Sequence, residues 1–177
     1  MIKTLFLDRD GIINEIVMRD GTVSSPRTVA EFVVRPDFLE FYKRIESTSL
    51  TLFVVSNQPD VRRGTIATVD LEQIVDAMKT RFKFTEILHC VHDDSDRCSC
   101  RKPQPGMISG FLEKYDLRAD EAIIIGDSYK DILAGKAAGI GTVYLQQGHN
   151  AVGSCEPDYV VNKLTEVFSL PPFEHLS

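Results

Sequence analysis

Short apolar runs alternate with amphipathic stretches along the chain. The apolar runs are rich in β-branched and aromatic residues, and we expect them to form strands. The first, second and fourth are almost continuously apolar, which is typical of parallel strands covered by helices on both faces. The expected strands span residues 2–7, 50–55, 85–91, 122–125 and 141–145, with a last short one at 158–161.

The stretches between these runs predict helices. Pro36 suits the first turn of the first helix, Thr68 is a candidate N-cap of the second, and Gly139 is a stop signal after the fourth. The first helix is amphipathic, and its apolar face is expected to carry Phe38, Phe41, Tyr42 and Ile45. The expected helices span residues 36–46, 69–82, 106–115, 129–138 and 163–168.

This alternation predicts an α/β fold with a doubly wound, mainly parallel sheet. A chain of 177 residues suits one domain, which we expect over residues 1–170, with a tail at 171–177. Functional residues in such sheets collect at the carboxyl ends of the strands. The polar residues that follow each expected strand are therefore the candidates for a site.

Composition narrows the classes of function. The net charge is −6 and no basic run is present, which argues against a nucleic-acid groove. No apolar stretch approaches the length of a membrane span, and the first residues lack the pattern of a secretory signal. A cytoplasmic protein is expected, in which the four cysteines would be reduced thiols.

Two carboxylates follow the first expected strand, at Asp8 and Asp10, and Gly11 permits the chain to leave the extended form there. Phosphate-ester chemistry needs two such acids. One is ionised and attacks phosphorus, and the other protonates the leaving alkoxide and then deprotonates a water molecule. The alternative is an ordinary surface turn, which Asp and Gly also favour.

Two further segments suit a phosphate ligand. Ser56 and Asn57 end the second strand and can donate hydrogen bonds without adding charge. Arg101 and Lys102 pair a planar guanidinium with a point-charge ammonium, and Pro103 keeps Lys102 out of the helical region. Taken alone, each segment is also ordinary turn material or solvated surface charge.

Asp127 follows the fourth expected strand directly after Gly126. A carboxylate there is placed to hold Mg²⁺ against Asp8, since Mg²⁺ prefers oxygen ligands. Alternatively, Asp127 or Ser128 caps the following helix. Asp131 is expected to hold the groups around the metal in place without binding the ion directly, rather than to ligate it through water or to face solvent.

A second cluster of ligand-type residues lies in the loop at 90–100. Cys90, His92, Cys98 and Cys100 suit a closed tetrahedral zinc site with a structural role. The alternative is a group of unrelated thiols and a surface histidine. Zinc here would hold the adjacent Arg101 and Lys102 rigidly, which limits the entropy lost when they bind phosphate. We expect the nearby Asp93, Asp94 and Asp96 to be solvated loop charges.

In this order the motifs resemble those of the haloacid dehalogenase (HAD) superfamily of phosphohydrolases, over roughly residues 3–146. The resemblance implies that Asp8 is the nucleophile and Asp10 the acid and base. It implies that Mg²⁺ is held by Asp8, the backbone carbonyl of Asp10 and Asp127. The phosphate would be bound by Ser56, Asn57, Arg101 and Lys102.

The cysteine motif followed by Arg-Lys-Pro resembles a subgroup without a cap domain, the D-glycero-D-manno-heptose 1,7-bisphosphate phosphatases and the histidinol-phosphate phosphatases. Ile13-Asn14 and Arg63-Gly64 favour the heptose enzymes, whereas the five-residue spacer from His92 to Cys98 favours the histidinol type. We favour the heptose bisphosphate, a small phosphorylated metabolite, with loss of its 7-phosphate, and a monomeric enzyme. A zinc-stabilised binding module without catalysis is the alternative of a different class.

Overall fold

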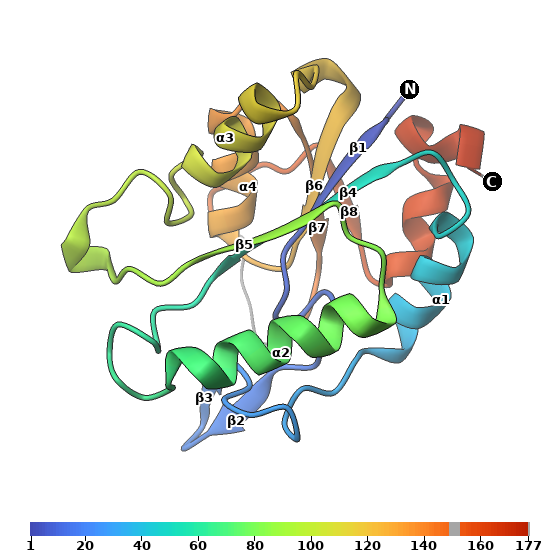
Figure 1. Ribbon diagram of the computed structural model, residues 1–177. Helices are drawn as coiled ribbons and strands as arrows, with labels where there is room; N and C mark the ends of the chain where they lie inside the picture. The colour runs from blue at the N-terminus through green and yellow to red at the C-terminus, as the bar shows by residue number, and fades with distance from the viewer. Residues whose placement is uncertain (149–152, 177) are drawn as a thin grey trace.

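The computed structural model describes residues 1–148 and 153–176, which fold around one central sheet (Figure 1). The six strands run in the order β5-β4-β1-β6-β7-β8, and every neighbouring pair is parallel. The strands are β1 (Thr4–Leu7), β4 (Thr51–Asn57), β5 (Glu86–Cys90), β6 (Ala122–Gly126), β7 (Gly141–Leu145) and β8 (Tyr159–Val161). The chain crosses from one side of β1 to the other, so the predicted doubly wound sheet is confirmed.

Helices cover both faces of this sheet. Alternate residues of β1 point to opposite faces, so Leu5 and Leu7 join one apolar cluster and Phe6 joins the other. The first cluster packs against α1 (Pro36–Ile45) and α2 (Thr68–Arg81), and the second against α3 (Gly106–Lys114) and α4 (Tyr129–Ala137). Two short 3₁₀ helices, η1 (Asp94–Asp96) and η2 (Ala119–Glu121), precede α3 and β6 respectively.

The apolar face predicted for the first helix is confirmed, because its four expected residues are the ones that α1 buries. Pro36 occupies its first turn, as expected. Thr68, by contrast, is the first residue of α2 and not its cap, since Ala67 holds that position without a side-chain hydrogen bond. The segment expected as a helix at 163–168 is the 3₁₀ helix η3 (Leu164–Ser169).

Residues 171–176 differ from the expected tail. They form a 3₁₀ helix, η4 (Pro171–Leu176), and the side chain of Phe173 is fully buried in the first apolar cluster. Two prolines are compatible with a first helical turn, because that turn needs no backbone donors. The described part of the domain therefore extends to residue 176.

The segment between β1 and α1 carries a small hairpin, β2 (Val17–Arg19) and β3 (Thr22–Ser24), which the apolar pattern did not predict. Among the described residues no second domain covers the carboxyl ends of the central strands. No helix in the described ranges is both long and apolar enough to cross a membrane.

Candidate active site

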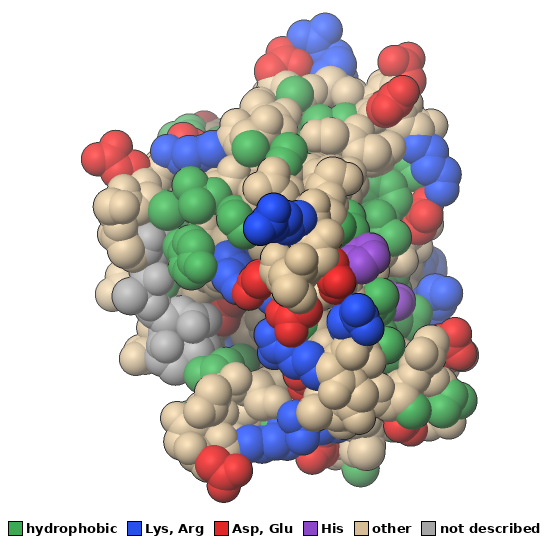
Figure 2. Space-filling view, turned by 90° about the vertical axis from the view of Figure 1, so that its left-hand side faces the viewer, with side chains coloured by type: hydrophobic (Ala, Val, Ile, Leu, Met, Phe, Trp, Pro, Cys, Tyr) green, Lys and Arg blue, Asp and Glu red, His purple; other side chains and the backbone are tan. Residues whose placement is uncertain are grey.

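A cavity of about 320 Å³ opens at the carboxyl ends of β1, β4 and β6. Figure 2 shows this side of the molecule, where acidic and basic side chains gather around the middle. Most of the predicted site residues line the cavity, namely Asp8, Asp10, Asn57, Arg101, Lys102 and Asp127. Ser56 is buried and is not among the lining residues.

Asp8 and Lys102 form a buried ion pair at the end of β1. The Lys102 Nζ atom lies 2.8 Å from Asp8 Oδ1, 2.5 Å from Asp131 Oδ1 and 2.7 Å from the carbonyl oxygen of Val55. Burial raises the pKa of Asp8 to about 7, although Lys102 acts in the opposite direction. Burial also disfavours the charged amine, but Asp131 and Asp8 outweigh this effect and raise the pKa of Lys102 above its ordinary value. Lys102 is therefore a cation whose three donors have defined acceptors.

The carboxylates of Asp8, Asp127 and Asp131 form an acidic cluster, with one oxygen of each within 4.8 Å of the others. All three side chains are buried. Lys102 donates to Asp8 and to Asp131, and the backbone N–H of Ser128 also donates to Asp131. Buried oxygens with excess negative charge suit a hard divalent cation such as Mg²⁺. The donor set therefore fits this metal.

Two glycines allow the acidic cluster to form. Gly11 has a φ of +80°, and a Cβ there would lie 2.0 Å from Asp127 Oδ2. A Cβ at Gly126 would lie 2.2 Å from the Cβ of Asp131. Ser128 is the N-cap of α4 and shares a capping box with Asp131, so the capping alternative applies to Ser128 and not to Asp127.

Asp10 lies beside the acidic cluster, and its carboxylate accepts five hydrogen bonds. The donors are Arg9 Nε and Nη2, Asn14 Nδ2, Ser25 Oγ and Gln58 Nε2. Burial disfavours the ionised form of Asp10. The charge of Arg9 and the neutral donors together exceed that effect and lower its pKa.

The backbone of Lys102, on the cationic side of the cavity, is held by the side chain of Asn57. Asn57 bonds to both backbone groups of Lys102, with Nδ2 donating to the carbonyl oxygen at 2.8 Å and Oδ1 accepting from the amide at 3.0 Å. Its side chain thus orients Lys102 in this structure. Ser56 Oγ accepts a hydrogen bond from Gln58 Nε2 at 2.8 Å.

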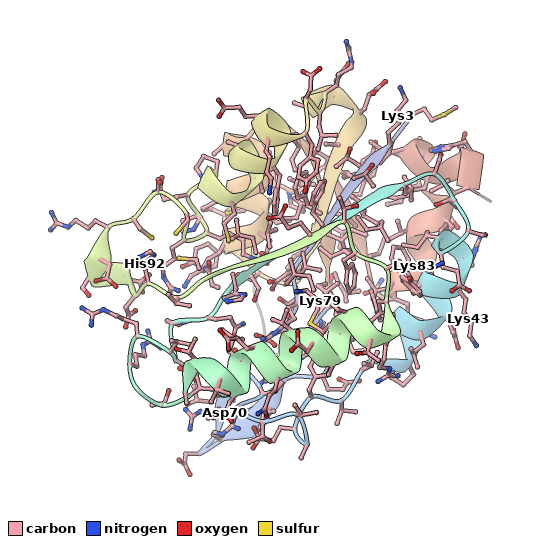
Figure 3. The ribbon with its side chains drawn as sticks, viewed as in Figure 1. Lys3, Lys43, Asp70, Lys79, Lys83 and His92 are labelled. Carbon is pink, nitrogen blue, oxygen red and sulfur yellow. The ribbon has the colours of Figure 1, made fainter. Side chains whose placement is uncertain are left out.

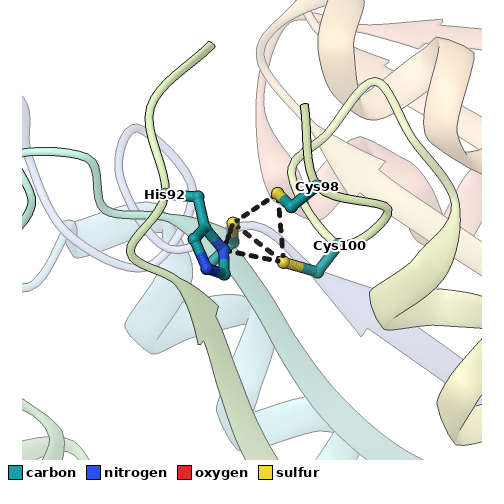
Figure 4. A group of neighbouring side chains, drawn as sticks. His92, Cys98 and Cys100 are labelled. Carbon is teal, nitrogen blue, oxygen red and sulfur yellow. Dashed lines mark hydrogen bonds between the residues drawn. The ribbon is translucent and has the colours of Figure 1, made fainter. Parts of the chain in front are cut away.

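The four residues predicted to bind zinc come together, with Cys90 at the end of β5 and the other three in the loop that follows it (Figure 4). The three Sγ atoms lie 3.0 to 3.6 Å apart, and His92 Nδ1 lies 3.3 Å from Cys100 Sγ and 3.5 Å from Cys90 Sγ. A tetrahedral zinc thiolate site has sulfur atoms roughly 3.8 Å apart. Each residue offers one ligand atom to a common centre, so the cluster suits a metal ion of this kind.

This loop lies on the same side of the molecule as the strand ends, as the position of His92 in Figure 3 shows. Cys98 Sγ accepts a hydrogen bond from the backbone N–H of Arg101 at 3.4 Å. The guanidinium of Arg101 in turn donates to the carbonyl oxygen of His92 at 3.2 Å. The cluster and the cationic side of the cavity are therefore in direct contact.

The acidic residues of the loop are not simply solvated, contrary to expectation. Asp94 accepts from Arg101 Nε at 2.7 Å, and Asp93 forms a bidentate pair with Arg63 at 2.6 and 2.7 Å. Asp96 lies 3.5 Å from Arg62. The pairs of Asp93 and Asp96 connect the loop to the neighbouring segment at 58–67, whereas the pair of Asp94 connects it to Arg101 at the cavity. In each case the folded chain brings the carboxylate to a guanidinium that is not its neighbour in the sequence.

Three residues that contact Asp10 were not predicted to belong to the site, namely Arg9, Asn14 and Ser25. Arg9 is almost completely buried, which is rare for an unpaired arginine and follows from its bonds to Asp10 and Gln58. Because Arg9 lies between Asp8 and Asp10 in the sequence, its contact with the site could have been predicted. Ser25 lies in an aperiodic segment, where no pattern indicates a contact.

Comparison with known proteins gives consistent results. The HAD-hydrolase-like family matches residues 99–167. The D-glycero-β-D-manno-heptose-1,7-bisphosphate 7-phosphatase of Bordetella bronchiseptica is 31% identical, covering 84% of this chain and 83% of the relative. The corresponding α-anomer enzyme of Campylobacter jejuni is 32% identical and covers 81% of each chain.

A solved structure is also similar over nearly the whole chain. It is the D,D-heptose 1,7-bisphosphate phosphatase from B. bronchiseptica, complexed with magnesium and phosphate. Its TM-score is 0.81 at 28% identity, with 95% of this chain and 97% of that chain covered. The chain thus belongs to the family of HAD-like phosphatases that includes the D-glycero-D-manno-heptose-1,7-bisphosphate 7-phosphatases.

Proposed function

We propose that this chain is a Mg²⁺-dependent phosphatase that removes the 7-phosphate from D-glycero-D-manno-heptose 1,7-bisphosphate. The observation that carries the proposal is the buried Asp8 at the end of β1, 2.8 Å from Lys102 and beside Asp127 and Asp131. The names of the relatives support the choice of sugar phosphate.

Magnesium would be held by Asp8, the backbone carbonyl of Asp10 and Asp127. When bound, it would neutralise part of the negative charge that an anionic nucleophile and an anionic ester bring together. Asp131 is engaged by Lys102 and by the backbone N–H of Ser128, which suits a supporting role. Its carboxylate fixes the position of the ammonium that faces the substrate.

In the first step, an oxygen of Asp8 attacks the phosphorus atom and the bond from phosphorus to the sugar oxygen breaks. The electron pair of that bond goes to the leaving oxygen, which takes a proton from Asp10. The product is an aspartyl-phosphate on Asp8 and a free sugar hydroxyl. Arg101 and Lys102 bind the phosphoryl oxygens during this step, for which Lys102 exchanges its hydrogen bond to Asp8 for one to the phosphoryl group.

In the second step, water attacks the phosphorus atom of the aspartyl-phosphate while Asp10 takes up one of its protons. The bond between phosphorus and the Asp8 oxygen breaks, and Asp8 leaves as a carboxylate. Inorganic phosphate is released, and Asp10 is again protonated for the next cycle. The open cavity admits this water, because no cap covers it among the described residues.

Zinc bound by Cys90, His92, Cys98 and Cys100 would be structural, since all four positions of a tetrahedral ion would be taken by protein ligands. It would hold Arg101 through the contact between its amide and Cys98. Thiolate ligands are kept in a reducing compartment, which fits a cytoplasmic enzyme, and we propose that it acts as a monomer.

The test measures phosphate release by the zinc-loaded protein with Mg²⁺ from three substrates, the α and β anomers of heptose 1,7-bisphosphate and histidinol phosphate. We expect the highest kcat/KM on one heptose anomer, with one phosphate released per molecule. Phosphorus NMR of the product should retain the anomeric phosphate signal. A higher kcat/KM on histidinol phosphate, or no release from either heptose anomer, would refute the assignment.

A further inference from the structure

The β2–β3 hairpin reaches the cavity beside Asp10. Ile16, Val23 and Ser24 of this region line the cavity together with Ser25, the residue directly after β3. The Ser25 Oγ atom donates to Asp10 Oδ2 at 2.7 Å, which is the shortest of the five hydrogen bonds to that carboxylate. The hairpin is thereby linked to the group that must exchange a proton with the substrate.

The other donors to Asp10 are held by the core of the domain. Arg9, Asn14 and Gln58 are at most 2% exposed, and each has a second hydrogen-bond partner. Gln58 also donates to Ser56, and Asn14 donates to the carbonyl oxygen of Glu15. Ser25 is partly exposed and lies outside the central sheet. It is therefore the partner of Asp10 whose position depends on the hairpin.

A hydroxyl also differs chemically from the other partners. The guanidinium of Arg9 and the amide N–H groups of Asn14 and Gln58 can only donate, whereas a serine hydroxyl both donates and accepts. Contact between Asp10 and Ser25 can thus persist when the proton moves to or from the carboxyl. None of the other four hydrogen bonds to Asp10 has this property.

The hairpin itself is fixed by charged contacts. Arg19 of β2 donates from Nη1 to the carbonyl oxygen of Ser25 at 3.0 Å and forms an ion pair with Glu31. Glu31 also accepts from the backbone N–H of Arg27 at 2.7 Å. Because these contacts lie on both sides of Ser25 in the chain, they hold its backbone in place.

We propose that Ser25 is a positioning residue for Asp10, and that the β2–β3 hairpin sets the orientation of the proton donor in this capless site. This inference rests on the proposed phosphatase function but not on the identity of the sugar. The hairpin thus orients one catalytic group, Asp10, without enclosing the site.

The test compares two esters that differ in their need for a proton donor. A primary alkyl phosphate releases a poor leaving group that must be protonated, whereas p-nitrophenyl phosphate releases a stabilised anion. The ratio of the two kcat/KM values reports the steps up to formation of the aspartyl-phosphate. We expect Ser25→Ala to lower kcat/KM for the alkyl ester about 10-fold and for p-nitrophenyl phosphate less than about 2-fold.

Two matched variants separate positioning from general damage. Ser25→Thr keeps the hydroxyl and should restore the alkyl rate to within about 3-fold of the unchanged protein. Ser24→Ala removes a hydroxyl from the same cavity that makes no contact with Asp10 in the described part of the chain, where it donates to the Ser25 carbonyl oxygen at 3.4 Å, so the ratio should not change. Arg19→Gln should shift the ratio in the direction of Ser25→Ala, by a smaller factor.

Equal losses on both esters in Ser25→Ala, no loss on either, or the same shift in Ser24→Ala would overturn the inference about Ser25. An unchanged ratio in Arg19→Gln would overturn the role of the hairpin. If the unchanged protein released phosphate from neither ester with Mg²⁺, the proposed phosphatase function itself would be wrong. Heptose specificity can fail in its own assay while both parts of this inference remain valid.

Discussion

Two clusters lie at the carboxyl ends of the strands but are held differently: the acidic cluster of Asp8, Asp127 and Asp131, and the cysteine–histidine cluster at the end of β5 and in the loop that follows. Asp8 and Asp127 directly follow central strands, Asp131 lies in the first turn of α4, and each of the three residues is at most 9% exposed. Three of the four zinc-type ligands lie in the loop beyond β5, and only Cys90 belongs to a strand and is fully buried.

This difference separates two ways of building a site. The strands and their apolar packing place the acidic cluster, so its geometry is a property of the fold itself. The cysteine–histidine cluster brings four ligand atoms together over eleven residues. Cys90 belongs to the second apolar cluster, but Cys98 and Cys100 are only partly buried against it and His92 is exposed, so a bound metal would supply much of the order of the loop. Substitutions in the acidic cluster should therefore abolish phosphate release. Loss of the cysteine–histidine cluster should instead make Arg101 and Lys102 more mobile and only reduce phosphate release.

The largest effect is expected from Asp8→Asn, which keeps the shape of the side chain and removes its nucleophilic oxygen. Phosphate release should fall by about 10⁴-fold or more. The fold should persist, because Lys102 retains its contacts with Asp131 and with the carbonyl oxygen of Val55. Initial rates with Mg²⁺ and the thermal midpoint of the same samples check both expectations.

Asp76→Asn is the matched control, since Asp76 is an exposed carboxylate on α2 far along the chain from the site. Its activity should equal that of the unchanged protein. Asp8→Asn with phosphate release within about 10-fold of the unchanged protein would contradict the assignment of Asp8 as the nucleophile. Unfolding of that variant would instead show that the acidic cluster stabilises the domain.

Two members of the acidic cluster could be predicted because Asp8 and Asp127 directly follow buried strands, and the parallel sheet brings these strand ends together. Asp131 joins them from the first turn of α4. The contacts of Ser25 and of Asp94 could not be predicted in this way. They depend on turns in segments without periodicity, and on which guanidinium a loop carboxylate reaches in three dimensions. Phe173 was missed for a related reason, because its burial depends on the packing of η4 and the Pro-Pro pair by itself suggested a loop.

Zinc removal gives the second largest expected effect. A chelator that strips the cysteine–histidine cluster, or Cys98→Ser, should lower phosphate release roughly 10- to 100-fold. The reason is that Cys98 accepts the hydrogen bond from the Arg101 amide. The far-UV circular dichroism should change little, because the central sheet does not depend on the loop.

Cys155→Ser serves as the control for loss of a thiol outside this cluster, since Cys155 is a free cysteine elsewhere in the chain. Zinc content by atomic absorption should fall in Cys98→Ser and stay unchanged in Cys155→Ser. Full activity after verified loss of zinc would mean that the loop holds Arg101 without the metal, and that the two clusters are equally preorganised.

The third prediction concerns the tight packing behind the acidic cluster. Gly126→Ala would place a Cβ 2.2 Å from the Cβ of Asp131, so the end of β6 or the start of α4 must shift. We expect the free energy of unfolding in urea to fall by about 1.5 kcal/mol. Gly110→Ala in α3 meets no atom within 4 Å and should raise it by about 0.5 kcal/mol, because alanine favours the helix. Equal effects of the two substitutions would contradict this account.

The smallest effect is expected from Asp94, whose side chain is 72% exposed and accepts from Arg101 Nε at the edge of the cavity. Substrate phosphate and the Asp94 carboxylate compete for the same guanidinium. In Asp94→Asn, Arg101 keeps its bonds to the His92 carbonyl oxygen and to Cys98 Sγ. The inhibition constant of inorganic phosphate should therefore decrease, roughly 2- to 5-fold.

Asp96→Asn removes a charge from the same loop, but Asp96 does not line the cavity and should leave that constant unchanged. A weaker inhibition by phosphate in Asp94→Asn would mean that Asp94 orients Arg101 and does not compete with the substrate. In that case the loop would position its cation through a carboxylate, as the acidic cluster positions Lys102 through Asp131. The two regions would then differ in their exposure and metal, but share one way of holding a positive charge.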